Sequence, residues 1–137
     1  MINGVVWLRI SSLVSLLFAA GHTLGGRTAW SPVGENEVLV LMRTVHFQVE
    51  GVSRSFLDFY RGFGYSLSVF LLLQAILLWQ FASIARIQPR AVRPVVASFA
   101  IASVLGGIIA WVFLFPVPML FSAVLTACLI VAFLTLR

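Results

Sequence analysis

The residues of this chain that are most able to take part in chemistry lie in one short segment. The stretch HFQVEGVSRSFLDFYRGFG, residues 46–64, holds one of the two histidines and four charged side chains, in a sequence with only nine basic and four acidic residues. His46 and Glu50 are four residues apart, so on a helix they would lie one turn from each other. A histidine and a carboxylate at that separation are weak candidates for an acid–base pair.

The charged residues of this region follow a helical repeat. Between residues 36 and 63, apolar side chains fall on one helical face and charged ones on the other. The charged face carries Arg43, His46, Glu50, Arg54, Asp58 and Arg61. The pattern predicts an amphipathic helix over about residues 37–60 with Asn36 as its N-cap. It also predicts that Arg54 pairs with Asp58 and that Glu50 belongs to the same network.

Two placements of this charged face remain open. The helix can lie in the membrane interface with its charges in water. Alternatively, it can fold over the mouth of a helix bundle and line a polar vestibule, where His22 at the end of the first apolar run would join it. The second placement defines a set of candidate ligand-binding residues: His22, Arg54, Asp58, Tyr60 and Arg61.

Helices that cross a membrane are the elements that must position these side chains. Hydrophobic residues make up 61% of the 137 residues and charged ones 9%, which is well below the roughly 25% of soluble domains. Crossing a bilayer takes about 20 apolar residues. The sequence predicts an all-α integral membrane protein: a single-domain bundle of four transmembrane helices with an extracytoplasmic amphipathic helix between spans 1 and 2. The spans cover about residues 5–24, 62–82, 94–114 and 118–136, the last two separated by a turn at Pro116 and Pro118.

The arginines predict the orientation of these spans. Arg86, Arg90 and Arg93 lie between spans 2 and 3, and Arg9 and Arg137 fall on the same side if there are four spans. That side carries no acid, so the positive-inside rule places both termini in the cytoplasm and residues 25–61 outside. The protein is therefore expected in the cell membrane, with its basic side contacting anionic lipids rather than nucleic acid. No cleaved signal peptide is expected, because a charged segment before the first apolar run is missing.

Small residues at helical spacing predict close packing of the spans. Such residues let transmembrane backbones approach each other. They are Ser11, Ser15 and Ala19 in the first span, Ser98, Ala102, Gly106 and Ala110 in the third, and Ser122 and Thr126 in the fourth. Gln74 lies in the middle of the second span, where its amide needs a polar partner, so we expect it to bond across helices.

Two motifs resemble those of a known family. AGHTLGG, around His22, and RSFLDFYRGFG, residues 54–64, are similar to the G-H-T and R-S-x-x-D-F-Y-x-G-F-G motifs of a family of small, uncharacterised bacterial membrane proteins with four spans. The resemblance covers nearly the whole chain. It implies the four-span architecture, a bacterial inner membrane, and a shared signature of His22, Arg54, Asp58, Tyr60 and Gly62.

A second and more local resemblance concerns HFQVEG. This stretch is similar to the H-x-x-x-E-G segment of the emopamil-binding sterol isomerases, which are also small helical membrane proteins. The resemblance implies that His46 and Glu50 move protons on a hydrophobic substrate. Here, however, the stretch precedes the second span instead of lying within one.

Three classes of function follow from these residues. The first is a non-enzymatic protein that binds a lipid-like ligand, such as membrane lipid or a hydrophobic small molecule, or that serves as an accessory subunit of a membrane complex. The polar head of such a ligand would lie at the outer mouth of the bundle, bordered by His22, Arg54, Asp58 and Tyr60, and its apolar tail in grooves formed by small residues between the spans. The second is a membrane enzyme with isomerase-like acid–base chemistry at His46 and Glu50. The third is haem or metal binding through His22 and His46. We favour the first class and expect no cofactor, no metal site and no nucleic-acid partner.

Overall fold

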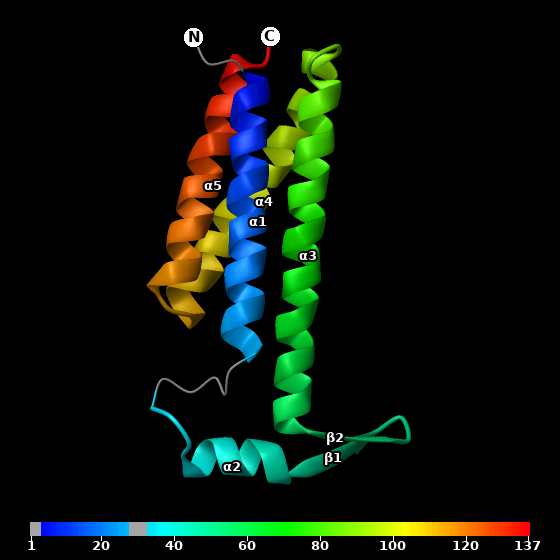
Figure 1. The fold of residues 1–137 in the computed structure, drawn as a ribbon, viewed down its shortest axis with the longest axis vertical. Coiled ribbons are helices and arrows are strands. Elements are labelled where there is room, and N and C mark those ends of the chain that lie inside the picture. The colour runs from blue at the N-terminus through cyan, green and yellow to red at the C-terminus, as the bar shows by residue number, and fades with distance from the viewer. Residues whose placement is uncertain (1–3, 28–32) are drawn as a thin grey trace. The chain divides into compact units, whose positions relative to one another are not determined.

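The computed structural model describes residues 4–27 and 33–137, which form five helices and one hairpin (Figure 1). Their order is α1 (Gly4–Arg27), α2 (Glu37–Thr44), β1 (His46–Val49), β2 (Val52–Ser55), α3 (Phe56–Ile84), α4 (Pro89–Phe113) and α5 (Pro116–Thr135). The helices α1, α3, α4 and α5 are each long and apolar enough to cross a membrane. The predicted fold class, an all-α bundle of four membrane-spanning helices, is therefore confirmed.

The chain divides into two compact units. The terminal unit comprises residues 1–18 and 71–137, and the middle unit comprises residues 19–70. Each unit has its own packing and its own charge composition. All four acidic residues belong to the middle unit, together with four arginines, whereas the other five arginines belong to the terminal unit.

The core of the terminal unit draws on all four long helices. Its fully buried members include Leu8 of α1, Leu78 of α3, Val96 of α4 and Leu129 of α5. The start of α1, the turn between α3 and α4 and the end of α5 lie together at one end of this unit (Figure 1). Gly4 permits the close approach of α1 to α5, because a Cβ at that position would lie 2.6 Å from Cγ of Leu136.

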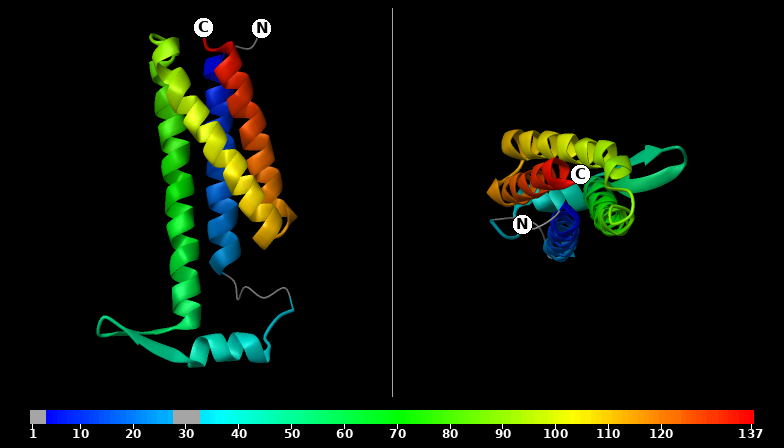
Figure 2. Two further views of the ribbon diagram at one scale, coloured as in Figure 1. Left: turned by 180° about the vertical axis from the view of Figure 1, so that it is seen from behind. Right: turned by 90° about the horizontal axis from the view of Figure 1, so that it is seen from above.

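Prolines mark where α4 and α5 begin. Pro89 and Pro116 occupy the first turns of their helices, where a missing amide donor costs no hydrogen bond. The two helices consequently start earlier than the predicted positions 94 and 118. They pack side by side in the terminal unit (Figure 2). In the seam between α4 and α5, Ser103 Oγ donates to the carbonyl of Ser122 at 3.1 Å.

The predicted amphipathic helix over residues 37–60 is correct only for its first part. Asn36 caps α2 by accepting from the Leu39 amide at 3.0 Å, as expected, but α2 ends at Thr44. Residues 46–55 then form an antiparallel hairpin, and α3 begins at Phe56. The chain can turn because Glu50 and Gly51 both adopt positive φ, at 52° and 81°, which is the conformation of a tight two-residue hairpin turn.

Candidate functional site

The start of α3 is held by reciprocal hydrogen bonds between Ser55 and Asp58. The Asp58 amide donates to Ser55 Oγ, and the Ser55 amide donates to Asp58 Oδ2, both at 3.1 Å. This is a capping box with aspartate in place of the usual glutamate. Among the described residues, no ion pair joins Arg54 to Asp58, so the predicted pairing is wrong. Arg54 lies in β2, where its guanidinium donates to the Ser53 carbonyl at 2.9 Å.

The other charged residues of the predicted face are exposed, and so is the candidate Tyr60. Glu50 lies in the hairpin turn, and Arg61 lies on the outside of α3. Tyr60 of α3 is 46% exposed. In the described part of the chain, Arg43 forms an ion pair with Glu35 at 3.2 Å, and both side chains are about half exposed. Such a surface pair contributes at most about 1 kcal/mol.

His46 and Glu50 do not lie one helical turn apart. His46 begins β1, and roughly 10 Å of extended chain separates it from Val49, immediately before Glu50. The His46 ring bonds through Nδ1 to the carbonyl of Thr44 at 2.8 Å and is exposed. The geometric premise of the acid–base pair is therefore wrong, because it depended on helical spacing.

His22 lies well away from the capping box. Its Nδ1 is 3.0 Å from Ser68 Oγ, which links α1 to α3 within the middle unit. Asp58 and Ser68 are ten residues apart on α3, which corresponds to a rise of about 15 Å. The structure therefore does not bring His22 together with Asp58, and a single polar vestibule formed by both is not supported.

The positions of His22 and His46 also bear on the hypothesis that both bind one haem. His46 is the cross-strand partner of Ser55, at the start of α3, whereas His22 contacts Ser68. About 20 Å along the axis of α3 separates Ser55, which caps the helix, from Ser68. Two axial ligands must reach one iron atom from its opposite sides, and this arrangement does not place the two rings for that. Among residues 4–27 and 33–137, no group of three or more metal-binding side chains is present.

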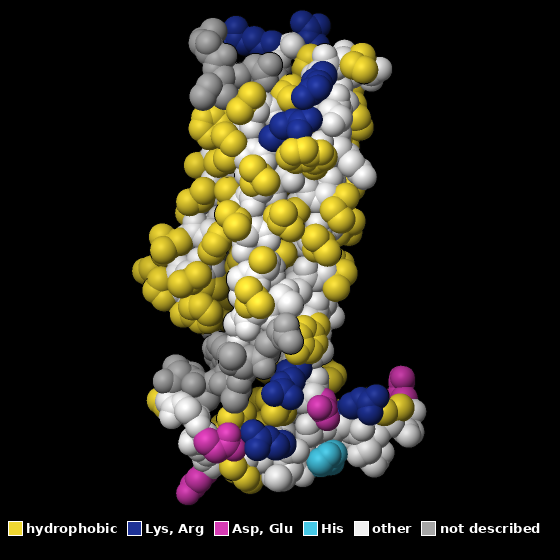
Figure 3. Space-filling model, viewed as in Figure 1, with side chains coloured by type: hydrophobic (Ala, Val, Ile, Leu, Met, Phe, Trp, Pro, Cys, Tyr) yellow, Lys and Arg dark blue, Asp and Glu magenta, His cyan; other side chains and the backbone are white. Residues whose placement is uncertain are grey.

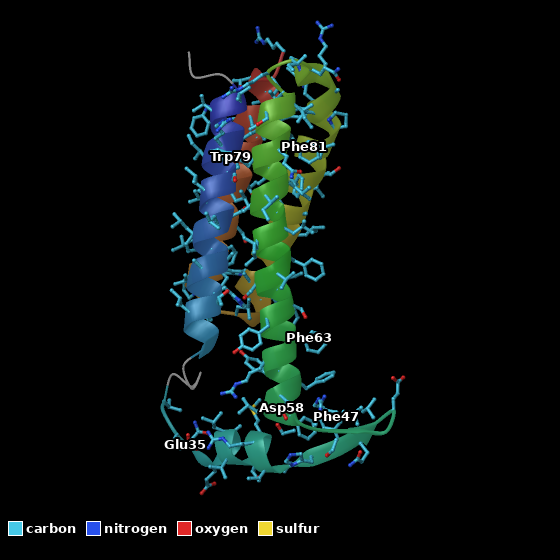
Figure 4. All side chains as sticks on the ribbon, turned by 45° about the vertical axis from the view of Figure 1, so that its right-hand side comes forward. Glu35, Phe47, Asp58, Phe63, Trp79 and Phe81 are labelled. Carbon is cyan, nitrogen blue, oxygen red and sulfur yellow. The ribbon has the colours of Figure 1, made fainter. Side chains whose placement is uncertain are left out.

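Aromatic side chains join the hairpin to the start of α3. The ring of Phe47 in β1 lies 5.0 Å from that of Phe56 and 5.7 Å from that of Phe59, and Phe59 meets Phe63 edge-on at 4.9 Å (Figure 4). Offset and edge-on contacts of this kind are favourable. The middle unit is thus held by aromatic packing and helix capping instead of by a network of charges.

Hydrogen bonds also cross between α1 and α3 in the terminal unit. Ser12 Oγ donates to the carbonyl of Ala75 at 2.7 Å, and Gln74 Nε2 donates to Ser15 Oγ at 3.2 Å. The prediction that Gln74 bonds across helices is confirmed. Ser12 and Ser15 are both buried, so each polar group has a partner away from lipid.

A groove opens along the outer side of α4 and α5 in the terminal unit. It has a volume of about 360 Å³, and every side chain that lines it is apolar. The lining residues are Ala97, Ala100, Ile101, Val104, Leu105, Ile130 and Phe133.

The small residues of α4 only partly match their predicted role in close packing. Gly106, Gly107 and Ala110 face α5 or the interior, whereas Ser98 and Ala102 are exposed.

Arg93 lies at one end of this groove. Its Cζ is 4.5 Å from the ring centroid of Phe133, which itself lines the groove. The Nε atom of Arg93 is buried and has no acceptor among the described residues. Arg9 makes a similar contact away from the groove, with its Cζ 4.1 Å from the Trp79 ring centroid. Its Nε is also buried and has no acceptor in the described ranges of the chain.

The sequence predicted small-residue grooves between the spans with the polar head at the outer mouth, and it used Arg93 only as a marker of topology. It did not identify this groove or the arginine at its end. A signal was present, because Arg93, Ala97, Ala100, Ile101 and Val104 follow one another at the spacing of a single helical face. That spacing does not reveal whether the face meets lipid or another helix.

Comparisons of the chain with protein-family models, with curated proteins and with solved structures find no match.

Proposed function

We propose that this chain is a four-span protein of the cell membrane that binds a lipid-like ligand in the α4–α5 groove and does not catalyse a reaction on it. The observation that carries the proposal is the groove itself, a hollow of about 360 Å³ lined by seven apolar side chains on two membrane-spanning helices. A polar metabolite would find no hydrogen-bonding partner among these side chains. An acyl chain matches the polarity of the groove.

The affinity of such a site comes from fit and not from the hydrophobic effect. Bulk lipid is as apolar as the groove, so a bound chain gains free energy only through closer packing than the surrounding lipid achieves. Each pair of contacting carbon atoms contributes only about 0.1–0.2 kcal/mol, and a concave wall supplies many such pairs. We therefore expect a ligand that stays bound through extraction in mild detergent but exchanges with added lipid.

A non-enzymatic role is favoured over the isomerase hypothesis. None of the seven lining side chains can donate or accept a proton. His46 and Glu50 belong to a hairpin in the other unit and are separated along extended chain. A membrane-embedded substrate in the groove would thus meet no acid–base pair there.

The distribution of charge supports an orientation with both termini in the cytoplasm. The terminal unit carries five arginines and no acid. Arginine-rich ends of membrane proteins remain on the cytoplasmic side. Dark blue side chains gather at the end of this unit where α1 starts and α5 ends (Figure 3).

Native mass spectrometry of the protein in mild detergent, with added phospholipid, tests the binding function. Ile101 lines the groove and is 63% exposed, so Ile101→Trp should fill the groove and remove the bound lipid. Ile109 is on the same helix, is 56% exposed and does not line the groove, so Ile109→Trp is the matched control. Lipid retained equally by wild type and by Ile101→Trp would show that the groove is not the site.

A further inference from the structure

We propose that the end of the α4–α5 groove at Arg93 recognises phosphate, and that the ligand of the groove is an anionic phospholipid. This inference rests on the proposed function, because it assigns a headgroup to the ligand whose acyl chain lies in the groove. The inference is carried by one juxtaposition: a wholly apolar groove ends at an arginine whose Nε meets no acceptor in the part of the chain that the structure describes.

Arg93 is placed to hold the head of a molecule whose tail lies in the groove. It precedes Ala97, the first lining residue of α4, by one helical turn on the same face. Its guanidinium lies over the ring of Phe133, and that ring also forms part of the groove wall. A ligand that follows the groove toward this end therefore reaches the guanidinium directly after the last apolar contact.

The guanidinium has unused capacity for hydrogen bonds. Its Nε is buried, and no acceptor within the described residues meets it. A buried donor without a partner costs about 1–3 kcal/mol, and the side chain recovers this cost only if it shifts so that Nε reaches an acceptor. Stacking on Phe133 fixes the plane of the guanidinium, and a planar guanidinium fork suits the oxygens of a phosphate.

The surroundings of Arg93 favour a headgroup with a net negative charge. The terminal unit contains no aspartate or glutamate that could pair with the ammonium group of a zwitterionic headgroup. Arg90 lies three residues before Arg93, and it shares a second hollow of about 460 Å³ with Arg137. Clusters of arginine at the membrane surface attract anionic lipids by about 1 kcal/mol for each arginine.

Arg9 provides a matched control for this assignment. It belongs to the same unit, lies over an aromatic ring and has a buried Nε that meets no acceptor among residues 4–27 and 33–137, as Arg93 does. Its ring partner is Trp79 of α3, and neither residue lines the groove. Loss of Arg9 removes the same charge as loss of Arg93 but leaves the groove and its end intact.

The test is a competition between phosphatidylglycerol and phosphatidylcholine with identical acyl chains, read by native mass spectrometry of the full chain. We expect wild type to retain phosphatidylglycerol by at least roughly fivefold over phosphatidylcholine, the ratio that one arginine contributes. Arg93→Gln should lower this ratio by roughly fivefold while lipid still binds. Arg9→Gln should keep the wild-type ratio.

A second variant keeps the test decisive if Arg93→Gln does not fold. Phe133→Leu leaves the groove apolar and the arginine charged but removes the ring that orients the guanidinium. A cation–π contact contributes about 0.5–1 kcal/mol, so the preference should fall roughly two- to fivefold. The assignment of the headgroup site to Arg93 is overturned by a preference that is unchanged in Arg93→Gln, or unchanged in Phe133→Leu where Arg93→Gln does not fold. It is also overturned by a preference that Arg9→Gln lowers equally.

The failure of this inference can be distinguished from the failure of the proposed function. Lipid that binds to wild type without any preference for phosphatidylglycerol, and that is lost in Ile101→Trp, would overturn the phosphate site and leave the groove as a lipid site. Retention of no lipid of either kind by wild type would overturn both.

Discussion

Replacing Ser55 by alanine removes the side chain that accepts from the third amide of α3. Ser55 is 4% exposed, and its hydroxyl accepts from the Asp58 amide at 3.1 Å. Loss of a serine N-cap costs about 1 kcal/mol, within a range of roughly 0.5–2 kcal/mol. Asp58→Ala removes the reciprocal bond and the favourable charge at the helix N-terminus, so its cost should be similar.

Arg54 is the control in this experiment. It is exposed, and its guanidinium donates a hydrogen bond to the carbonyl of the preceding residue. Arg54→Gln should therefore change the stability of the first turn of α3 by less than about 0.5 kcal/mol. If Asp58 were instead stabilised by an ion pair with Arg54, this substitution would cost as much as Asp58→Ala.

Hydrogen exchange at the start of α3 is the assay. A loss of about 1 kcal/mol in the local opening free energy speeds the exchange of the Ser55 and Asp58 amides by roughly fivefold. Amides in the α4–α5 seam should exchange at the wild-type rate in the same sample and serve as an internal reference. The capping argument is refuted if Ser55→Ala leaves the Asp58 amide unchanged, or if Arg54→Gln accelerates it as much.

Three further predictions concern the bundle and its orientation. Gln74→Leu removes the bond to Ser15 and should lower the free energy of unfolding by about 0.6 kcal/mol, with an upper limit of roughly 1.7 kcal/mol, in detergent unfolding curves; a stabilised variant would contradict this. Gly4→Val should cost about 1–3 kcal/mol because an added Cβ meets Leu136 and the Ala132 carbonyl, and an unchanged melting temperature would show that α1 and α5 do not approach closely. A cysteine placed at Gln88, in the Cys128→Ala background, should react with an impermeant reagent only after the membrane is opened, and labelling of intact cells would reverse the proposed orientation.

The long helices could be predicted because uninterrupted apolar runs of this length suit few other structures. The residues at which these helices begin were harder to predict from the sequence. Pro89 and Pro116 were expected to precede the helices, yet proline is compatible with the first helical turn, so α4 and α5 begin at these residues. The start of α3 at Phe56 depends on the bonds between Ser55 and Asp58, which the charge pattern had assigned to an ion pair.

Residues 46–55 illustrate why periodicity alone was insufficient. Phe47 and Val49 alternate with polar residues as in a strand, while the four-residue spacing of the charges also fits a helix. The hairpin is favoured where Glu50 and Gly51 take positive φ, and a Glu-Gly pair is a weaker turn signal than Asn-Gly or Asp-Gly. The groove was inaccessible for another reason, since it depends on which faces α4 and α5 turn toward each other.

Photocrosslinking would test the central claim, that a lipid chain occupies the α4–α5 groove, most directly. The protein is reconstituted with phosphatidylglycerol that carries a diazirine in its acyl chain, irradiated, digested and mapped by mass spectrometry. The account predicts that crosslinks concentrate at residues 97–105 of α4 and 130–133 of α5, and that Ile101→Trp abolishes them while Ile109→Trp does not. Crosslinks spread evenly over the exposed apolar residues of all four long helices would contradict it.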